Sequence, residues 1–388
     1  MPVLNRIAAA TEEISAWRRD LHRFPELMYD LPRTAGFVAE KLRAFGCDEV
    51  VEGIGRSGVV AVVRGREPGR GQVIGLRADM DALPILEQTG LAYASSLPGT
   101  MHACGHDGHT AMLLGAARHL AETRAFAGTA ILIFQPAEEG EAGARAMLDD
   151  GLLERFAPEE IYGMHNMPGI PVGQFAVRPG PIMASTDRLE IFIDGRGAHA
   201  AKPHQGVDPV LVGSAIVMAL QQVVARNVDP LESAVVSITM FHAGVVENVI
   251  PQTAELVGTA RTLKPEVRAM LQQRLPAIVE GVASAYGATA RLNWVDGYPV
   301  TANHPAQTIF AAQVAAEIVG TDKVDANVAP MMGAEDFSFM LEARPGAFIF
   351  IGNGDSAGLH NPRYDFDDAA IPFGASYWVR LVEAAMPL

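Results

Sequence analysis

Hydrophobic residues in the first half of the chain alternate between helical and strand-like spacing. Residues 14–27, 34–45 and 110–123 carry apolar side chains three and four positions apart, which predicts amphipathic helices. Short apolar runs bounded by Gly or Pro have the length of buried strands, and they lie at 58–63, 72–76, 129–134 and 161–164. Strands that alternate with helices are typical of a mainly parallel sheet covered on both faces. The pattern therefore predicts an α/β fold.

The pattern changes after the Pro/Gly-rich segment 178–182. The elements that follow are expected in the order strand, helix, strand, strand, helix, strand, at 189–194, 209–226, 234–243, 252–262, 265–286 and 289–295. This β-α-β-β-α-β order is that of ferredoxin-like domains. A second punctuated segment, 296–299, leads back to helix and strand patterns. We therefore predict a discontinuous α/β domain, residues 1–182 and 296–388, interrupted by an α+β insertion over 183–295.

Composition and charge narrow the class of protein. The 388 residues are 49% hydrophobic and 19% charged, which is ordinary for a globular enzyme and too apolar for a disordered chain. A formal net charge of −15 argues against a nucleic-acid partner. With only two cysteines, no visible secretory signal and no membrane-length apolar run, we expect a soluble cytoplasmic protein.

Side chains of the metal-binding types follow four predicted strands, at the point where each strand ends. They are Asp79 and Asp81 after 72–76, Glu138 and Glu139 after 129–134, His165 after 161–164, and His360 after 348–351. In open α/β sheets, ligands bind beyond the carboxyl ends of the strands. Four separate segments are therefore expected to bring carboxylates and imidazoles to one edge of the sheet.

The densest group of such residues is Met101-His-Ala-Cys-Gly-His-Asp-Gly-His109. Cys104 and His106 are one residue apart, and the neighbouring glycines allow the backbone to turn tightly around an ion. The helix expected from residue 110 would favour the thiolate form of Cys104 through its dipole. We expect His102 and His109 to support the ligands or cap the helix.

The sequence leaves the roles of the remaining polar residues open. Adjacent carboxylates such as Glu138 and Glu139 can divide the work between a metal ligand and a general base. His165 and His360, taken singly, fit a ligand or a hydrogen-bonded histidine equally well. For Asp79 and Asp81 we favour a supporting position behind the ligands over direct binding.

Four motifs in this order resemble one family, the amidohydrolase branch of the aminoacylase/carboxypeptidase metallopeptidases. This branch includes hippurate hydrolases, auxin-conjugate hydrolases and N-acetyldiaminopimelate deacetylases. The motifs are Leu76-Arg-Ala-Asp-Met-Asp-Ala-Leu-Pro84, the segment Met101–His109, Gln135-Pro-Ala-Glu-Glu-Gly140 and Gly197-Ala-His-Ala-Ala-Lys-Pro203. The resemblance extends over essentially the whole chain.

The resemblance implies a site for two divalent metal ions, with the ligands Cys104, His106, Glu139, His165 and His360. It implies that Glu138 is the general base, and that His199 of the insertion reaches the active site of the other subunit. Asn248 matches a position that contacts substrate, while Asp79 stands where related carboxypeptidases have a histidine ligand. The insertion would pair two subunits into a homodimer, which would in turn allow a tetramer.

The expected reaction is hydrolysis of the amide bond of an N-acyl amino acid, giving a carboxylic acid and a free amino acid. Sulfur, nitrogen and oxygen ligands together suit zinc, and they also admit manganese, cobalt or nickel. A dipeptidase or carboxypeptidase of the same fold is the nearest alternative.

Three other classes fit the sequence less well. In a cysteine hydrolase, Cys104 and His106 would be poorly placed as nucleophile and base, and Glu139, His165 and His360 would have no role. A nucleotide-binding dehydrogenase would need a G-x-G-x-x-G turn between a strand and a helix, which the sequence lacks. A metal-binding protein without activity would have no need of a general base such as Glu138.

Overall fold

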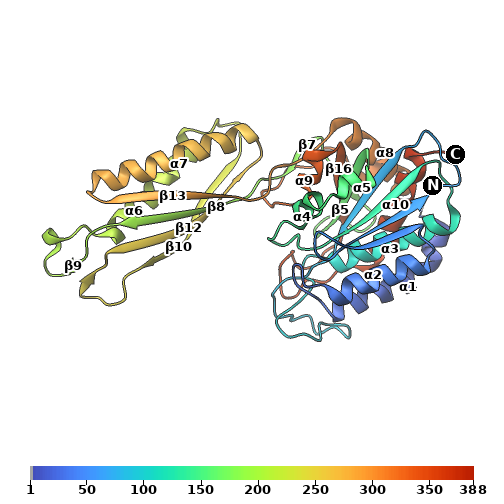
Figure 1. The fold of residues 1–388 in the computed structure, drawn as a ribbon, viewed down its shortest axis with the longest axis horizontal. Helices are drawn as coiled ribbons and strands as arrows, with labels where there is room; N and C mark the ends of the chain where they lie inside the picture. Colours follow the sequence, from blue (N-terminus) through green and yellow to red (C-terminus); the bar gives the residue numbers. More distant parts are fainter. Residues whose placement is uncertain (1–2) are drawn as a thin grey trace. The chain divides into compact units, whose positions relative to one another are not determined.

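The computed structural model describes residues 3–388, and these form two compact units (Figure 1). The first unit holds the described chain up to Ile182 together with Ala302–Ala329 and Asp336–Leu388. The second unit holds Met183–Thr301 and Pro330–Glu335. Two short strands, β7 (Gly180–Met183) and β14 (Thr301–Asn303), lie where the chain passes from one unit to the other.

An eight-stranded sheet with the order β1-β2-β4-β3-β5-β16-β6-β15 forms the centre of the first unit. Its strands are β1 (Glu49–Ile54), β2 (Gly58–Arg64), β3 (Val73–Asp79), β4 (Thr129–Gln135), β5 (Glu160–Met167), β6 (Phe175–Ala176), β15 (Val324–Asp325) and β16 (Gly346–Gly352). The four neighbours β4, β3, β5 and β16 run parallel to one another, whereas β1 and β2 are antiparallel additions at one edge. The prediction of an α/β fold with a mainly parallel sheet is confirmed.

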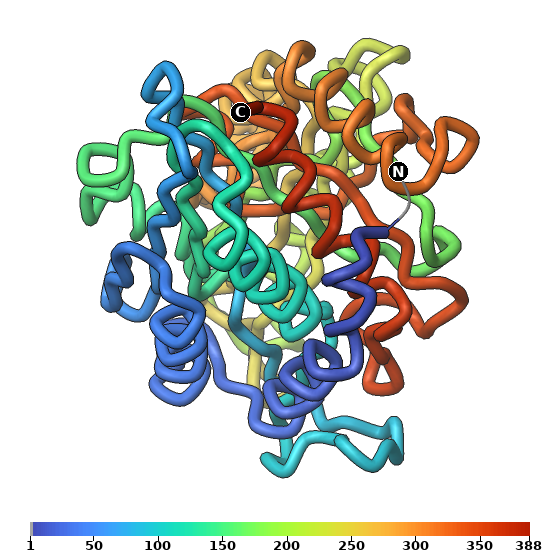
Figure 2. Tube along the Cα trace, turned by 90° about the vertical axis from the view of Figure 1, so that its right-hand side faces the viewer, coloured from blue at the N-terminus to red at the C-terminus, as the bar shows by residue number. Residues whose placement is uncertain are grey.

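Helices cover both faces of this sheet. They are α1 (Asn5–Arg23), α2 (Pro32–Ala44), α3 (His106–Thr123), α4 (Gly143–Asp149), α5 (Leu152–Phe156), α8 (Pro305–Val319), α9 (Ser338–Ala343) and α10 (Ile371–Ala385). The first and last of them, α1 and α10, pack against each other and against α3, although they come from opposite ends of the chain (Figure 2).

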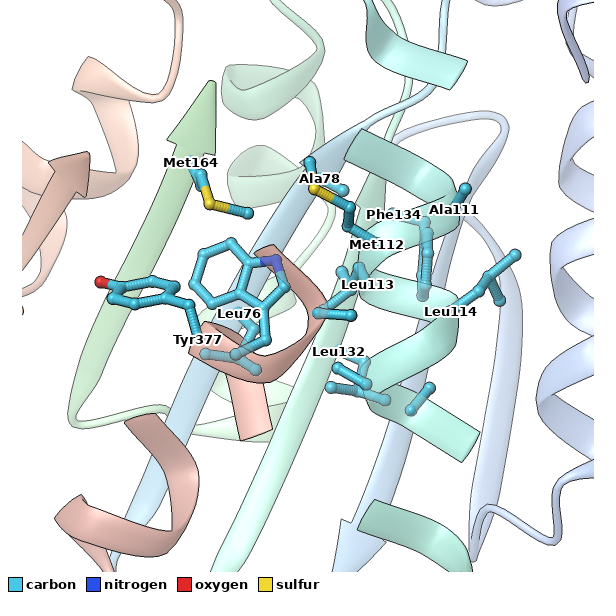
Figure 3. Packing of buried hydrophobic residues seen from close by; sticks show 14 of the residues in the cluster. Leu76, Ala78, Ala111, Met112, Leu113, Leu114, Leu132, Phe134, Met164 and Tyr377 are labelled. Atoms are coloured by element: carbon cyan, nitrogen blue, oxygen red, sulfur yellow. The ribbon is translucent and has the colours of Figure 1, made fainter. Parts of the chain in front are cut away.

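The core of the first unit lies between α3 and the central strands. Met112 and Leu113 of α3 pack towards Leu76 of β3 and Leu132 of β4, and all four side chains are fully buried (Figure 3). Burying one such side chain stabilises the fold by roughly 1.5–3 kcal/mol. Because β3 and β4 are covered on both faces, their sequences are nearly continuous apolar runs, as expected of central parallel strands.

Two predicted helices had wrong boundaries. The first helix spans Asn5–Arg23, not residues 14–27. Its early end is explained by Pro25, which disfavours helical backbone in the residue before it. The third helix begins at His106, four residues earlier than expected, directly after Gly105 with a left-handed φ of 87°. Polar residues fill its first turn, which hid its start in the hydrophobic pattern. As a result His106 and His109 lie on the helix itself.

The second unit is a four-stranded antiparallel sheet, with the order β10-β12-β8-β13, and two helices. Its elements are β8 (Asp187–Asp194), α6 (Pro209–Arg226), β10 (Ala234–Ala243), β12 (Thr253–Thr262), α7 (Pro265–Ala285) and β13 (Thr289–Asp296), with a short pair formed by β9 (Ala198–His199) and β11 (Val249–Ile250). Both helices pack their apolar residues on one face of the sheet, as Figure 1 shows for α7 along β13.

One helix among the described residues, α6, is long and apolar enough to cross a membrane by length and composition. This is weak evidence for a membrane span, because a helix of a folded core passes the same test. The side chains of Ile216, Leu220 and Val223 are buried in the core of the second unit. Asp208 and Pro209 begin the helix: the Asp208 carboxylate accepts the backbone N–H of Val210 at 2.9 Å, as an N-cap does.

Candidate metal centre

The polar residues that follow the strands meet at one edge of the sheet in the first unit. Asp79 is the last residue of β3, and it pairs in register with Gln135, the last residue of β4. His165 lies near the end of β5, beside Phe350 of the parallel strand β16. Because β4, β3, β5 and β16 are adjacent and parallel, their carboxyl ends all open on the same side.

The loop before α3 carries Cys104 into this edge and is fixed from two sides. The backbone carbonyl of Cys104 accepts a hydrogen bond from Asn166 Nδ2 at 2.6 Å, and the backbone N–H of His360 donates to the Ala103 carbonyl at 2.7 Å. Gly105 turns the chain into the helix, and a Cβ there would collide with the side chains of Asn166 and Tyr364. The glycine is therefore required both by its positive φ and by the space available.

The imidazoles of His106 and His165 present the same nitrogen to the site. His106 Nδ1 lies 2.8 Å from the Asp81 carbonyl, and His165 Nδ1 lies 2.6 Å from the Asn166 carbonyl. A carbonyl oxygen only accepts, so Nδ1 carries a proton in both rings, and Nε2 is the nitrogen left to bind a metal ion. His106 Nε2 is buried and has no hydrogen-bond partner among residues 3–388, and His165 Nε2 lies 3.4 Å from Cys104 Sγ. Histidine ligands of metals are held in this way.

Glu139 and His360 complete the group. His360 Nε2 lies 3.1 Å from Glu139 Oε1, but this contact lacks hydrogen-bond geometry, so within the described part of the chain this buried oxygen accepts no hydrogen bond. Two sets of potential ligand atoms share Cys104: one with His106 and His165, the other with Glu139 and His360. Within each set the atoms lie within 4.8 Å of one another. The structure thus brings all five predicted ligands together.

The charges around these ligands favour a bound cation. Burial acts to lower the pKa of His106, but the carboxylates of Asp79, Asp81 and Glu139 outweigh it and raise that pKa to about 10. Burial, with Glu139 and Glu138 nearby, raises the pKa of the Cys104 thiol well above its usual value. Burial and these carboxylates thus oppose the thiolate form that the dipole of α3 is expected to favour. A bound divalent ion would lower the pKa of His106 and of the Cys104 thiol, and the nitrogen and sulfur atoms of these side chains would then be its ligands.

Glu138 lies beside the ligand group and is held by Asp81. The side chain of Glu138 is almost fully buried, and a carboxylate oxygen of Glu138 lies within 4.8 Å of ligand atoms of His106 and Glu139. The backbone N–H of Glu138 donates to Asp81 Oδ1 at 3.0 Å, and that of Glu139 donates to Asp81 Oδ2 at 3.2 Å. Both oxygens of Asp81 are thus used to hold the turn that carries the two glutamates.

The carboxylate of Asp79 is hydrogen-bonded to neighbouring side chains on both of its oxygens. It accepts hydrogen bonds from Arg77 Nη1 at 2.8 Å and from His109 Nδ1 at 2.6 Å. Burial opposes its ionisation, but His106, Arg77 and His109 outweigh burial and hold its pKa well below the usual range. His109 Nε2 in turn accepts the backbone N–H of Asn166 at 2.9 Å. Asp79 and His109 therefore hold Asn166, which itself holds the Cys104 loop.

Sequence reasoning missed several residues that organise this edge: Arg77, Gln135, Asn166, Asp336 and Tyr364. Asn166 adjoins His165, and Arg77 and Gln135 stand inside motifs already singled out, so proximity to those motifs was the only available signal. His102 does not join the ligand group. Its ring is fully buried, lies 6.3 Å from that of His22, and burial lowers its pKa to about 3.

His199 and Asn248 are neighbours in the second unit. His199 on β9 pairs in register with Val249 on β11, and the Asn248 carbonyl accepts the backbone N–H of Ala200 at 3.0 Å. The exposed imidazole of His199 accepts the Ala201 backbone N–H at Nδ1, at 3.1 Å. Its proton therefore resides on Nε2, which is free to act as a donor.

Comparisons of the sequence and of the fold with known proteins agree on one family. The chain is 42% identical to a hippurate hydrolase of Campylobacter jejuni over 98% of each protein, and 42% identical to an N-acetylcysteine deacetylase of Bacillus subtilis over 94% of each. A solved Bacillus subtilis structure, described as a dinuclear metal binding peptidase of the M20 family, superposes with a TM-score of 0.85 at 38% identity, over 98% of this chain and 99% of that one. The model of peptidase family M20/M25/M40 matches residues 75–384, and the chain belongs to this family.

Proposed function

We propose that the protein is a metal-dependent amidohydrolase that cleaves the amide bond of N-acyl amino acids. The observation that carries this proposal is the pair of imidazoles of His106 and His165, each fixed through Nδ1 by a backbone carbonyl and each with a ring nitrogen within 4.8 Å of Cys104 Sγ in a buried, carboxylate-rich site. The names of the relatives, a hippurate hydrolase and an N-acetylcysteine deacetylase, support acylated amino acids as the substrate class.

Two divalent ions would be held by Cys104, His106, Glu139, His165 and His360. Cys104 belongs to both sets of potential ligand atoms, which favours it as the ligand common to the two ions. Bound ions of this kind lower the pKa of water to about 7 and polarise a carbonyl group. The mixture of sulfur, nitrogen and oxygen donors favours zinc, with manganese, cobalt and nickel as substitutes.

Glu138 is the general base of the proposed reaction. Its carboxylate accepts a proton from the attacking water and passes that proton to the leaving nitrogen, so that the acid and the amine separate. Its burial and its backbone hydrogen bond to Asp81 support this role, because a base must be held within hydrogen-bond reach of the reacting atoms.

His199 of one subunit would stabilise the oxyanion in the active site of its partner, and Asn248 would contact the same substrate. The exposed position of His199 and its free Nε2–H support a donor role. One such donor contributes on the order of 3 kcal/mol to lowering the barrier. Asn248 lies next to His199 in the second unit, which supports a shared task.

The second unit is the proposed dimerisation domain. Its edge strand β10 exposes Met240 and Phe241, and the loop after β10 exposes Val245, which is 97% accessible. On α6, Leu211 and Met218 are also exposed. A bare sheet edge flanked by apolar side chains favours pairing with a second copy of the same surface. We propose a homodimer, and a tetramer would need a further interface.

Both cysteines, Cys47 and Cys104, are free thiols, which supports the proposed cytoplasmic location.

The test begins with protein stripped of metal by a chelator. Zinc or manganese is then added back in measured amounts, and release of amino acid is followed with N-acetyl, N-benzoyl and longer N-acyl amino acids. Activity that returns as two equivalents of metal bind, and that is absent in Glu138→Gln at equal metal content, supports the proposal. Metal binding without turnover of any of these amides would overturn it.

A further inference from the structure

Asp336 is a fully buried residue that is not among the five proposed ligands of the two ions, and an oxygen of its carboxylate lies within 4.8 Å of a carboxylate oxygen of Glu138, the proposed base. It is the residue at which the chain re-enters the first unit, two positions before α9. The next residue, Phe337, is also fully buried, and its ring packs against that of Phe348 of β16 with centroids 5.4 Å apart. Asp336 is therefore anchored in the core of the first unit.

The carboxylate of Asp336 is surrounded by donors from three segments. Arg77 Nη2 of β3 donates at 3.0 Å, and Gln135 Nε2 of β4 lies 2.8 and 2.9 Å from the two oxygens. The backbone N–H of Ala144, in the first turn of α4, donates at 2.9 Å. Burial of a carboxylate is costly unless it is paired and hydrogen-bonded, and these contacts satisfy that requirement.

The same residue also reaches the proposed base. The backbone N–H of Asp336 donates to Glu138 Oε1 at 3.4 Å, which is long for a hydrogen bond. Ala144, which the Asp336 carboxylate holds, closes the turn that begins at Pro136, and within this turn the Gly143 N–H donates to the Ala137 carbonyl. Asp336 therefore holds both the carboxylate of Glu138 and the far end of the turn that carries it.

Asp81 holds the same turn from the opposite side, through the backbone N–H groups of Glu138 and Glu139. Arg77 joins the two halves of the site, because it donates to Asp79 at 2.8 Å as well as to Asp336 at 3.0 Å. Arg77 also donates from Nε to Gln135 Oε1 at 2.8 Å. The buried guanidinium of Arg77 thus connects Asp79, which supports the Cys104 loop, with Asp336, which supports Glu138.

We propose that Asp336 is a positioning residue for Glu138, acting together with Arg77 and Gln135. The inference rests on the proposed function, in which Glu138 is the general base. The contacts described above join Asp336 to Glu138 and to the turn that carries it, so we expect its loss to affect the base rather than metal affinity. Supporting residues of this kind typically change activity by about 10- to 100-fold.

The test compares Asp336→Asn with wild type. An asparagine keeps the shape but turns an amide N–H₂ towards donors, so the support is broken. We expect kcat to fall by about 10- to 100-fold, while KM and the number of metal ions bound per subunit stay close to wild type. A second variant, Asp336→Asn with Gln135→Glu, exchanges carboxylate and amide across the network. It restores a negative partner for Arg77 and an acceptor for the new amide, so kcat should recover in part.

Two controls separate the outcomes. Asp187→Asn breaks another buried aspartate–arginine pair, with Arg268 in the second unit, and should lower thermal stability without a comparable loss of kcat. Glu138→Gln reports on the proposed function itself. If Glu138→Gln is inactive but Asp336→Asn keeps wild-type kcat, the positioning role is wrong and the proposed function stands. Full activity of Glu138→Gln would overturn both. Loss of metal in Asp336→Asn, or no recovery in a folded double variant, would also overturn the positioning role.

Discussion

The backbone N–H of Glu138 donates to Asp81 Oδ1 at 3.0 Å, across 57 positions of sequence. The other oxygen of Asp81 receives the N–H of Glu139, so one carboxylate fixes two adjacent glutamates with different proposed tasks. Asp81 thus fixes the backbone of both residues, and carboxylate oxygens of Glu138 and Glu139 lie within 4.8 Å of each other.

Asp81→Asn should therefore weaken metal binding and catalysis together. Asparagine retains one acceptor oxygen and turns an N–H₂ towards the other backbone donor, so the turn is displaced. We expect metal affinity and kcat each to fall by about 10- to 100-fold. Competition with a chromogenic chelator gives the affinity, and steady-state kinetics at saturating metal gives kcat. Unchanged metal affinity would show that Asp81 does not support Glu139.

Ala137 precedes Glu138 and has a left-handed backbone, with φ of 52°. For a non-glycine residue this conformation costs on the order of 1–2 kcal/mol. Ala137→Gly should relieve the strain and also loosen the turn, so kcat should fall several-fold while the free energy of unfolding changes by less than about 1 kcal/mol.

Ala157→Gly is the matched control for this change. Ala157 has φ of 45°, and it is an exposed residue at the end of α5, away from the ligand group. It should alter the unfolding free energy by a similar amount and leave kcat unchanged. Thermal or urea unfolding and kinetics on both variants check the pair. Equal kcat values in the two variants would contradict a functional role for the strained turn.

A mixed dimer tests whether His199 acts across the subunit interface. Glu138→Gln and His199→Ala subunits, co-expressed with different affinity tags, should each be nearly inactive as homodimers. In the isolated heterodimer, one of the two sites has an intact Glu138 and receives His199 from the partner, so about half of wild-type activity should return. An inactive heterodimer would place the action of His199 within its own subunit, and failure to form one would argue against the dimer.

We expect His22 to make the stability of the fold sensitive to alkaline pH. Its ring is fully buried and lies 2.9 Å from Asp107 and 3.4 Å from Glu87. Burial and Arg18 act to lower its pKa, but the hydrogen bonds to Asp107 and Glu87 outweigh them and raise it from 6.5 to about 9. A raised folded-state pKa contributes stability that is fully present below the unfolded value and is lost as pH rises through the folded value.

The free energy of unfolding should therefore fall by about 3 kcal/mol between pH 6.5 and pH 9.5 because of this group. Urea unfolding across that range, at constant metal content, measures the change. His22→Gln should be less stable at pH 6.5 and should show a flatter profile. Parallel profiles for the two proteins would mean that His22 is not protonated in the folded state.

Much of the fold followed from the sequence because local patterns decide it. The strands β3 and β4 could be predicted from their apolar runs, because strands buried on both faces are apolar along nearly their whole length. Candidate ligand positions were also found, because polar residues follow these strands, but the choice of five ligands came from the resemblance to a known family. Helix ends were harder to predict. The first turn of α3 is polar, because His106 faces the ligand group and Asp107 pairs with buried Arg18 and His22.

By itself, the sequence determined the α/β class, the family and the identity of the ligand candidates. Only the tertiary structure decided which nitrogen of His106 and His165 faces the site, because the choice depends on the carbonyls of Asp81 and Asn166 that take the other nitrogen's proton. It also decided that Asp79 is bound by Arg77 and His109, and that Asp336 lies beside Glu138. Hydrogen bonds between distant residues, such as that between Asp336 and Glu138 across 198 positions, leave no trace in local periodicity, which records only what lies on each element's own buried face.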